Sequence, residues 1–283
     1  MKELHKRTLS GIAILTVSAA GVLVNGWLYT LLMSAVILLA TIEYHRLALG
    51  RRYLRERLCI ILAELLFFVG AAASLAGWLP ARWLTLSVLP LFAAMAMLLS
   101  DGGEGHDFNP HLFFPIVYIL LPVSLSLLLG FSYRASGVYT PQLTAPVISI
   151  AWIADIGAYF FGMAFGQRPN SRKLAPSLSP NKSWAGVWGA LLVSLVASLL
   201  AWWVYNLLNI QVMSLPMWLT MAVVIAVAGI FGDLFESLIK RHFSVKDSSH
   251  FIPGHGGILD RFDDLFFVFP AVTVLLVLIG IIG

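Results

Sequence analysis

The stretch WAGVWGALLVSLVASLLAWWVYNLL, residues 184–208, contains no charged side chain. A helix needs about 20 apolar residues to cross a hydrocarbon core of about 30 Å, so this stretch is long enough to span a membrane. The whole chain shares its character, because 59% of the 283 residues are hydrophobic and only 11% are charged, against about 25% charged in average globular chains. We therefore expect an all-α, polytopic integral membrane protein.

Eight further apolar stretches give about nine predicted transmembrane helices. Backbone polar groups inside a bilayer must bond within their own segment, so each stretch is expected to be helical. The predicted limits are 9–25, 27–42, 58–78, 83–99, 112–130, 143–165, 184–208, 214–235 and 265–282. We predict a single membrane domain over residues 1–283, with N-terminal helices in 1–142 and catalytic helices and loops in 143–283.

The positions of Lys and Arg indicate how these helices are oriented, because cytoplasmic loops carry the excess of positive charge. With nine alternating spans, all but two of the 18 Lys and Arg residues fall on the side of the N-terminus, and the exceptions are Arg82 and Arg134. We predict a cytoplasmic N-terminus. The basic residues are scattered over several loops, so membrane topology explains the net charge of +4 better than a nucleic-acid partner does.

Acidic side chains gather near the end of the eighth predicted span and the start of the ninth. In GDLFESLIKR, residues 232–241, Asp233 and Glu236 share a helical face with Lys240 if the helix continues. The ninth span is preceded by Asp260, Asp263 and Asp264. One acid would satisfy a helix cap, and unit charges 4 Å apart interact by about 4 kcal/mol at an effective dielectric of 20. The group is therefore expected to bind a cation, and carboxylate oxygens suit Mg²⁺.

Basic residues and glycines stand beside these acids. The basic residues are Lys240, Arg241, Lys246 and Arg261, and the glycines belong to PGHGG, residues 253–257. Glycines let backbone N–H groups approach an anion closely. A metal, several cations and a Gly-rich turn together indicate a phosphate site.

Two more features of the C-terminal half carry polar groups. Asp155 lies within the sixth predicted span, where an ionisable side chain costs about 2.5 to 3.5 kcal/mol on insertion scales and indicates function by default. A structural hydrogen bond to a neighbouring helix is the alternative. The loop at 172–186 is expected to present Ser179 and Lys182 to the cytoplasm. Lys182 is either a phosphate ligand or an ordinary lysine of a cytoplasmic loop.

These stretches resemble the phosphatidate cytidylyltransferases, also called CDP-diacylglycerol synthases. The family signature S-x-x-K-R-x4-K-D-[SG]…P-G-H-G-G-x-x-D-R-x-D corresponds to SLIKRHFSVKDSSHFIPGHGGILDRFD, residues 237–263. Also similar are GDLFES (232–237), WIADIGAYFFG (152–162) and KLAPSLSPNKSWAG (173–186). The N-terminal half resembles the family in its span pattern and in Glu43. Ala185 and Asp264 depart from the family pattern, which bears on fine substrate preference.

The resemblance implies transfer of the cytidylyl group of CTP to phosphatidate, giving CDP-diacylglycerol and pyrophosphate. The reaction is expected at the cytoplasmic face of a bacterial-type inner membrane. The substrates are expected to meet in a cleft between the sixth, eighth and ninth spans. The resemblance supports a site in which Asp233 and Asp260 hold Mg²⁺, while Asp263 orients this ion or holds a second cation such as K⁺. The family alone suggests a homodimer.

The remaining assignments concern the substrates. Lys182, Lys240, Arg241 and Arg261 are expected to neutralise phosphates, and Asp155 and Asp247 to orient phosphates or a metal. Ser179 and Lys246 are assigned to substrate binding, and the turn formed by His255, Gly256 and Gly257 is expected to lie against CTP. Two other functions stay open at this point: a cytidylyltransferase for another lipid phosphate, and a cation transporter whose path would use Asp155 and Glu64.

Overall fold

The computed structural model describes residues 2–100, 109–133, 137–249, 251 and 256–282, without the side chains of residues 2–10, 99 and 100. The chain is divided into two units. The first comprises residues 1–139 and 247–262, and the second comprises residues 140–246 and 263–283. Each unit is therefore built from two separate parts of the sequence.

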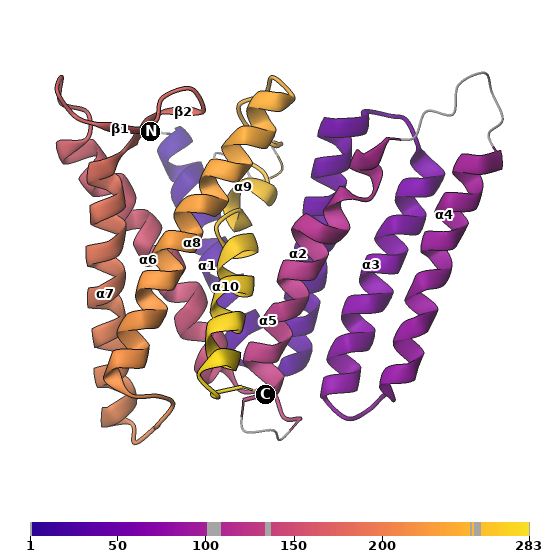
Figure 1. Cartoon of the computed structure of the whole chain (residues 1–283), viewed down its shortest axis with the longest axis horizontal. Helices are drawn as coiled ribbons and strands as arrows, with labels where there is room; N and C mark the ends of the chain where they lie inside the picture. Colours follow the sequence, from indigo (N-terminus) through magenta and orange to yellow (C-terminus); the bar gives the residue numbers. More distant parts are fainter. Residues whose placement is uncertain (1, 101–108, 134–136, 250, 252–255, 283) are drawn as a thin grey trace. The chain divides into compact units, whose positions relative to one another are not determined.

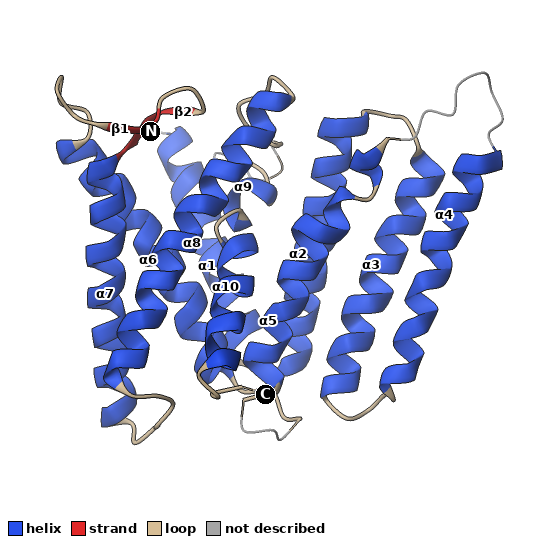
Figure 2. Ribbon diagram, in the orientation of Figure 1, coloured by secondary structure: helices blue, strands red, loops and turns tan. Residues whose placement is uncertain are grey.

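The first unit is helical in its described part (Figures 1 and 2). Its elements are α1 (Lys2–Leu23), α2 (Gly26–Leu49), α3 (Leu54–Leu75), η1 (Ala81–Ser87), α4 (Val88–Ser100), η2 (Pro110–Leu112), the π-helical η3 (Ile116–Leu120), α5 (Leu121–Phe131) and the short α9 (Leu259–Phe262). Asn25 caps α2, since its side-chain oxygen accepts a hydrogen bond from Leu28 N at 2.9 Å. Inside the unit, Thr41 Oγ1 donates to Glu64 Oε2 at 2.8 Å. This bond between α2 and α3 lowers the cost of burying the Glu64 side chain.

The second unit combines four long or medium helices with a small hairpin. Its elements are α6 (Pro141–Phe165), β1 (Lys173–Ala175), β2 (Ser179–Ser183), α7 (Trp184–Leu207), α8 (Leu215–His242) and α10 (Leu265–Leu278). Small residues let the helices pack closely, and a Cβ added to Gly157 of α6 would lie 2.8 Å from Gly189 O of α7. Ala154, Ala190 and Ala226 form a buried cluster contributed by α6, α7 and α8. Close packing through small residues is typical of helices in membranes.

The prediction of a multi-pass helical membrane protein is confirmed. Seven helices in the described part of the chain are long and apolar enough to cross a membrane: Gly26–Leu49, Leu54–Leu75, Ala81–Leu98, Pro110–Phe131, Pro141–Phe165, Trp184–Leu207 and Leu215–His242. They correspond to the second to eighth predicted spans. The predicted count of nine is not confirmed, because α10 has 14 residues and the apolar part of α1 within the described side chains is Gly11–Leu23.

The predicted loop at 172–186 is wrong in part. Two short antiparallel strands, β1 and β2, pair Lys173 with Ser183 and Ala175 with Ser179. Pro180 is compatible with β2 because both strands of a two-stranded hairpin are edge strands. Proline lacks a backbone N–H, and on the outer side of an edge strand no interstrand hydrogen bond is lost. The fold is therefore helical with one added hairpin.

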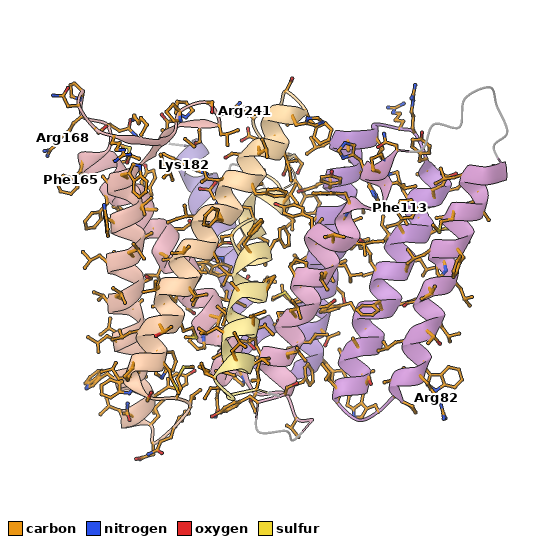
Figure 3. The ribbon with its side chains drawn as sticks, in the orientation of Figure 1. Arg82, Phe113, Phe165, Arg168, Lys182 and Arg241 are labelled. Carbon is orange, nitrogen blue, oxygen red and sulfur yellow. The ribbon has the colours of Figure 1, made fainter. Side chains whose placement is uncertain are left out.

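The hairpin and the last turns of α8 lie at the same end of the second unit. Figure 3 shows Arg168, Lys182 and Arg241 at this end. The guanidinium of Arg168 lies 5.2 Å from the centre of the Phe165 ring, which places a cation over an aromatic face. Basic residues that the sequence analysis placed in the loops after the sixth and eighth predicted spans therefore lie at one end of the second unit.

Candidate active site

A row of charged side chains follows the last turns of α8. The condition for a common face of Asp233, Glu236 and Lys240 is met, since α8 continues beyond the predicted span and ends at His242. Lys240 Nζ lies 2.5 Å from Glu236 Oε2, and the Glu236 side chain is only 1% exposed. A buried charge is costly unless it is paired, so Lys240 lowers the cost of burying this glutamate.

The turn before α10 brings another acid to this row. Gly232 permits the approach, because a Cβ at this position would overlap the backbone of residues 263 and 264. As a result, one carboxylate oxygen from each of Asp233, Glu236 and Asp263 lies within 4.8 Å of the others. The structure thus brings together two of the three predicted metal ligands and adds Glu236, which the sequence analysis had not assigned to the metal.

The electrostatics of Asp263 favour a bound cation. Burial raises the pKa of the Asp263 carboxyl well above its ordinary value, and the charges of Asp264, Asp233 and Asp155 raise it further. Lys240 lowers this pKa. Ionised carboxylates need a positive partner at such a spacing, and three oxygen ligands suit a hard ion such as Mg²⁺. The described residues therefore fit the predicted metal.

Asp264 serves a different purpose from its neighbour. Its Oδ1 accepts a hydrogen bond from Leu265 N at 2.7 Å, at the start of α10. The side chain is buried, and desolvation is the main reason why the pKa of Asp264 is raised well above its ordinary value. Capping thus accounts for this one aspartate of the three that precede α10.

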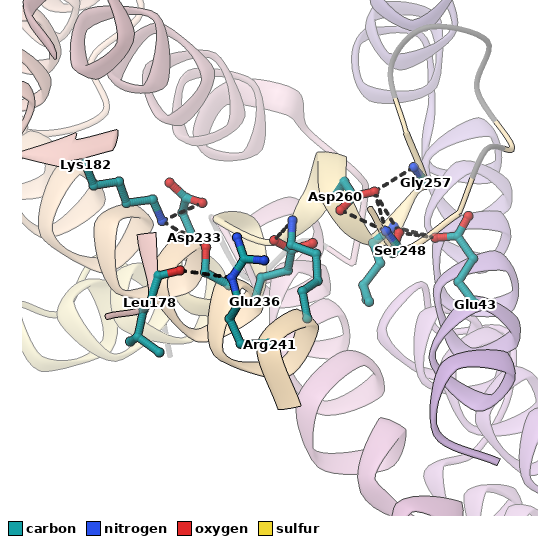
Figure 4. A network of polar contacts seen from close by, with 12 residues as sticks. Glu43, Leu178, Lys182, Asp233, Glu236, Arg241, Ser248, Gly257 and Asp260 are labelled. Atoms are coloured by element: carbon teal, nitrogen blue, oxygen red, sulfur yellow. Dashed lines mark hydrogen bonds and ion pairs between the residues drawn. The ribbon is translucent and has the colours of Figure 1, made fainter. Parts of the chain in front are cut away.

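The hairpin supplies a cation to the acids of α8 (Figure 4). Lys182 Nζ lies 2.7 Å from Asp233 Oδ1 and 3.4 Å from Ser237 Oγ. Nearby, Arg241 Nε donates a hydrogen bond to Leu178 O at 3.3 Å. These contacts hold β2 and the preceding turn against the last turns of α8.

A cavity of about 540 Å³ opens beside this ion pair, a size typical of small-molecule sites. Its polar lining includes the predicted residues Asp155, Ser179, Lys182 and Asp233, and the rest is mostly small or apolar. The lining comes from α6, α7, α8 and the hairpin. The cavity thus includes the sixth and eighth predicted spans together with α7 and the hairpin, and the participation of the ninth predicted span stays a prediction.

Asp260 lies in the first unit, where it organises its own loop. Its Oδ2 accepts hydrogen bonds from Gly257 N at 2.8 Å, Ser248 N at 3.0 Å and Ser248 Oγ at 2.8 Å. Gly256 has a φ of 81°, and a Cβ there would lie 2.7 Å from Asp260 Oδ2. The glycine is thus required by both backbone conformation and space. The assignment of Asp260 to the metal stays a prediction.

A family model described as "Cytidylyltransferase family" matches residues 5–279. This match covers most of both units and every site residue described above. The chain belongs to the cytidylyltransferase family.

Individual relatives of this cytidylyltransferase are bacterial proteins with one shared name. A phosphatidate cytidylyltransferase of Pseudomonas aeruginosa is 35% identical over 278 residues, which cover 96% of this chain and 97% of that protein. One of Thermotoga maritima is 35% identical over 240 residues, 84% of each chain. One of Staphylococcus epidermidis is 43% identical over 129 residues, 45% of this chain and 46% of that protein.

The remaining predicted substrate-binding residues are exposed or lie outside the described residues. Arg241, Lys246, Asp247 and Arg261 are exposed. His255 lies outside the described residues. The substrate roles of all five stay predictions.

Sequence reasoning assigned no individual role at the site to two buried glutamates, although Glu236 belonged to the acidic group expected to bind a cation. Glu236 stands on the same helical face as Asp233, so its position was available from the 3.6-residue period. Glu43 lies near the end of α2, and its signals were an acid in an apolar helix and the family resemblance at this position. None of these signals identifies the partners that these carboxylates contact.

Proposed function

We propose that this protein transfers the cytidylyl group of CTP to phosphatidate, giving CDP-diacylglycerol and pyrophosphate. The observation that carries this proposal is the cavity beside the Lys182–Asp233 ion pair and the acid cluster, within a helical membrane protein of the cytidylyltransferase family. Three relatives with the printed name phosphatidate cytidylyltransferase support the choice of lipid substrate.

The proposed reaction does not require a general base from the protein. A phosphate monoester has its second pKa near 6, so the lipid phosphate is already nucleophilic at neutral pH. Its oxygen attacks the α-phosphorus of CTP, a new P–O bond forms, and the bond to the β-phosphate breaks to release pyrophosphate. The main barrier is the repulsion between two polyanions, which positioning and charge neutralisation reduce.

The acid cluster is proposed to hold Mg²⁺ through Asp233 and Asp263, with Glu236 beside them. When bound there, the ion would neutralise phosphate charge and orient the CTP phosphates. Asp260 remains a proposed ligand from the sequence, and K⁺ remains the proposed second cation. Two lysines, Lys182 and Lys240, already offset part of the acidic charge at distances of 2.7 and 2.5 Å from their partners.

Basic side chains are proposed to bind the substrate phosphates. Lys182 lines the cavity and reaches Asp233, so it can contact a phosphate that approaches this carboxylate. Lys240, Arg241, Lys246 and Arg261 are the further proposed cations. Ser179 and Asp155 line the same cavity and are proposed to orient the substrate.

The cellular setting is also part of the proposal. We place the site at the cytoplasmic face of a bacterial-type inner membrane, because CTP is a water-soluble nucleotide and the basic residues of the sequence concentrate on that predicted side. A homodimer is a proposal that rests on the family resemblance alone.

A reconstitution experiment tests the activity. Purified protein in vesicles, supplied with CTP, Mg²⁺ and a panel of lipid phosphates, is expected to convert phosphatidate to CDP-diacylglycerol, identified by product mass. Asp233→Asn should reduce turnover by roughly 100-fold or more, whereas Thr220→Ser, at the other end of α8, should not. A product from another lipid phosphate alone would replace phosphatidate as the substrate. Ion flux without any nucleotide product would favour a transporter and end the proposal.

A further inference from the structure

Glu43 has an unusual set of partners for a residue near the end of an apolar helix. Its carboxylate is buried, with only 4% of the residue exposed. Oε1 accepts hydrogen bonds from Ser249 Oγ at 2.6 Å and Ile258 N at 3.0 Å. Oε2 accepts from Ser248 Oγ at 3.2 Å and Leu259 N at 2.9 Å. Three donors, and a Ser248 hydroxyl that is shared with Asp260, thus converge on one side chain of α2.

These donors come from two ends of one segment that is distant in the sequence. Ser248 and Ser249 begin it, and Ile258 and Leu259 end it at the first turn of α9. The separation from Glu43 is 205 positions for Ser248 and 216 for Leu259. A single carboxylate therefore fixes both ends of the segment to α2, as Figure 4 shows for the Ser248 end.

Two further contacts extend this arrangement to predicted site residues. A Cβ added to Gly257 would overlap both Glu43 Oε2 and Ser248 Oγ, so a larger residue here would displace these two side chains. The Ser248 hydroxyl also lies 2.8 Å from Asp260 Oδ2. Glu43 thus reaches Asp260 through one shared side chain and lies beside Gly257.

We propose that Glu43 is a positioning residue for the cytidylyl transfer, which orders Gly257 and Asp260 from the N-terminal helices. This inference rests on the proposed function, because it assigns those two residues to the CTP and metal site. It explains why an acid stands at this place in α2 and why residues 247–262 belong to the first unit.

The chemistry requires a carboxylate rather than an amide. Serine hydroxyls can turn to accept a hydrogen bond, but the backbone N–H groups of Ile258 and Leu259 can only donate. In Glu43→Gln the amide presents one oxygen and one NH₂ group, and the two backbone donors contact different oxygens. Whichever way the amide is turned, one backbone N–H therefore faces another donor and loses its bond.

Hydrogen exchange measured by mass spectrometry tests the anchoring without any turnover. In Glu43→Gln, the amides of residues 258 and 259 should exchange about tenfold faster, as expected for the loss of one hydrogen bond. Ser249→Ala, which removes one hydroxyl donor only, should give a smaller increase and serves if the first variant folds poorly. Glu64→Gln is the matched control, because this buried acid contacts Thr41 and not the segment.

Steady-state kinetics separate a positioning role from a structural one. Glu43→Gln should raise the KM for CTP by about tenfold or more and should leave the KM for phosphatidate and the melting temperature near those of the wild type. Unchanged exchange at residues 258 and 259 would overturn the inference. Faster exchange with an unchanged KM for CTP would also overturn it, since Glu43 would then only stabilise the fold. A wild-type protein that makes no CDP-diacylglycerol would instead refute the proposed function, while the exchange result would still report on the anchor.

Discussion

Lys182 and Asp233 form an ion pair between the hairpin and α8, with 2.7 Å between Nζ and Oδ1. Both side chains also line the 540 Å³ cavity. The two residues come from parts of the sequence that were assigned separately to phosphate binding and to metal binding. Their contact means that changes at either residue alter the electrostatic environment of the other.

Removing the Lys182 charge should weaken CTP binding. Lys182→Met keeps most of the side-chain length but leaves Asp233 without its cation, so we expect kcat/KM for CTP to fall by roughly 10- to 100-fold. The control is Lys173→Met in the same hairpin, whose amine contacts Gly166 O and Gln167 Oε1. Initial rates against CTP concentration measure both variants. Equal kinetics for the two variants would show that Lys182 is an ordinary basic residue of the hairpin.

Divalent ions should be required for turnover, and Asp263 should set the concentration needed. EDTA is expected to abolish CDP-diacylglycerol formation, and added Mg²⁺ should restore it. Asp263→Asn should raise the Mg²⁺ concentration for half-maximal activity by about tenfold or more. Binding of Mn²⁺, followed by electron paramagnetic resonance, supplies a second measurement that needs no turnover. Full activity after complete chelation would contradict the metal assignment.

The buried cap Asp264 should make stability depend on pH. Its pKa in the folded protein lies above the ordinary value of 3.8, so the folded state binds more protons and stability falls as pH rises above about 4. Asp264→Asn keeps an oxygen for Leu265 N and cannot ionise. In metal-free detergent solution its melting temperature should exceed that of the wild type more at pH 8 than at pH 5.

A second Asp264 variant separates capping from ionisation. Asp264→Leu lacks an acceptor for Leu265 N, which should cost about 1 kcal/mol at either pH. If the melting temperatures of the wild type and Asp264→Asn changed in parallel with pH, ionisation of Asp264 would have no part in the stability.

Gly232 should be intolerant of even one added carbon. A Cβ there would overlap the backbone at residues 263 and 264, so Gly232→Ala should cost about 1 to 3 kcal/mol. Gly229→Ala is the matched control on the same helix, because its Cβ would make an ordinary contact of 3.7 Å with Asp264 Cβ. Thermal unfolding in detergent compares the two. If the two variants had equal melting temperatures, the backbone at residues 263 and 264 would be able to move away from the added Cβ without loss of stability.

Periodic features of the molecule were predictable from the sequence, and contacts between distant segments were not. The apolar stretches predict the helices, and the spacing of Asp233, Glu236 and Lys240 predicts their common face, because both depend on helix geometry alone. The hairpin was missed since its strands are short, contain Pro180 and lack alternating hydrophobicity. The partners of Glu43 depend on a chain separation of more than 200 residues, which no local pattern reports.

The hydroxyl of Ser248 has one proton and two carboxylate neighbours, Asp260 Oδ2 at 2.8 Å and Glu43 Oε2 at 3.2 Å. It can donate to only one of them at a time. Any positive charge that engages Asp260 makes this carboxylate a weaker acceptor, so the proton turns toward Glu43 and strengthens the hold of α2 on the segment. By thermodynamic reciprocity, a firmer hold on the segment must then favour the cation to the same extent. If Asp260 binds a cation as proposed, the direction of the Ser248 O–H bond would couple cation binding to the contact between Glu43 and the segment.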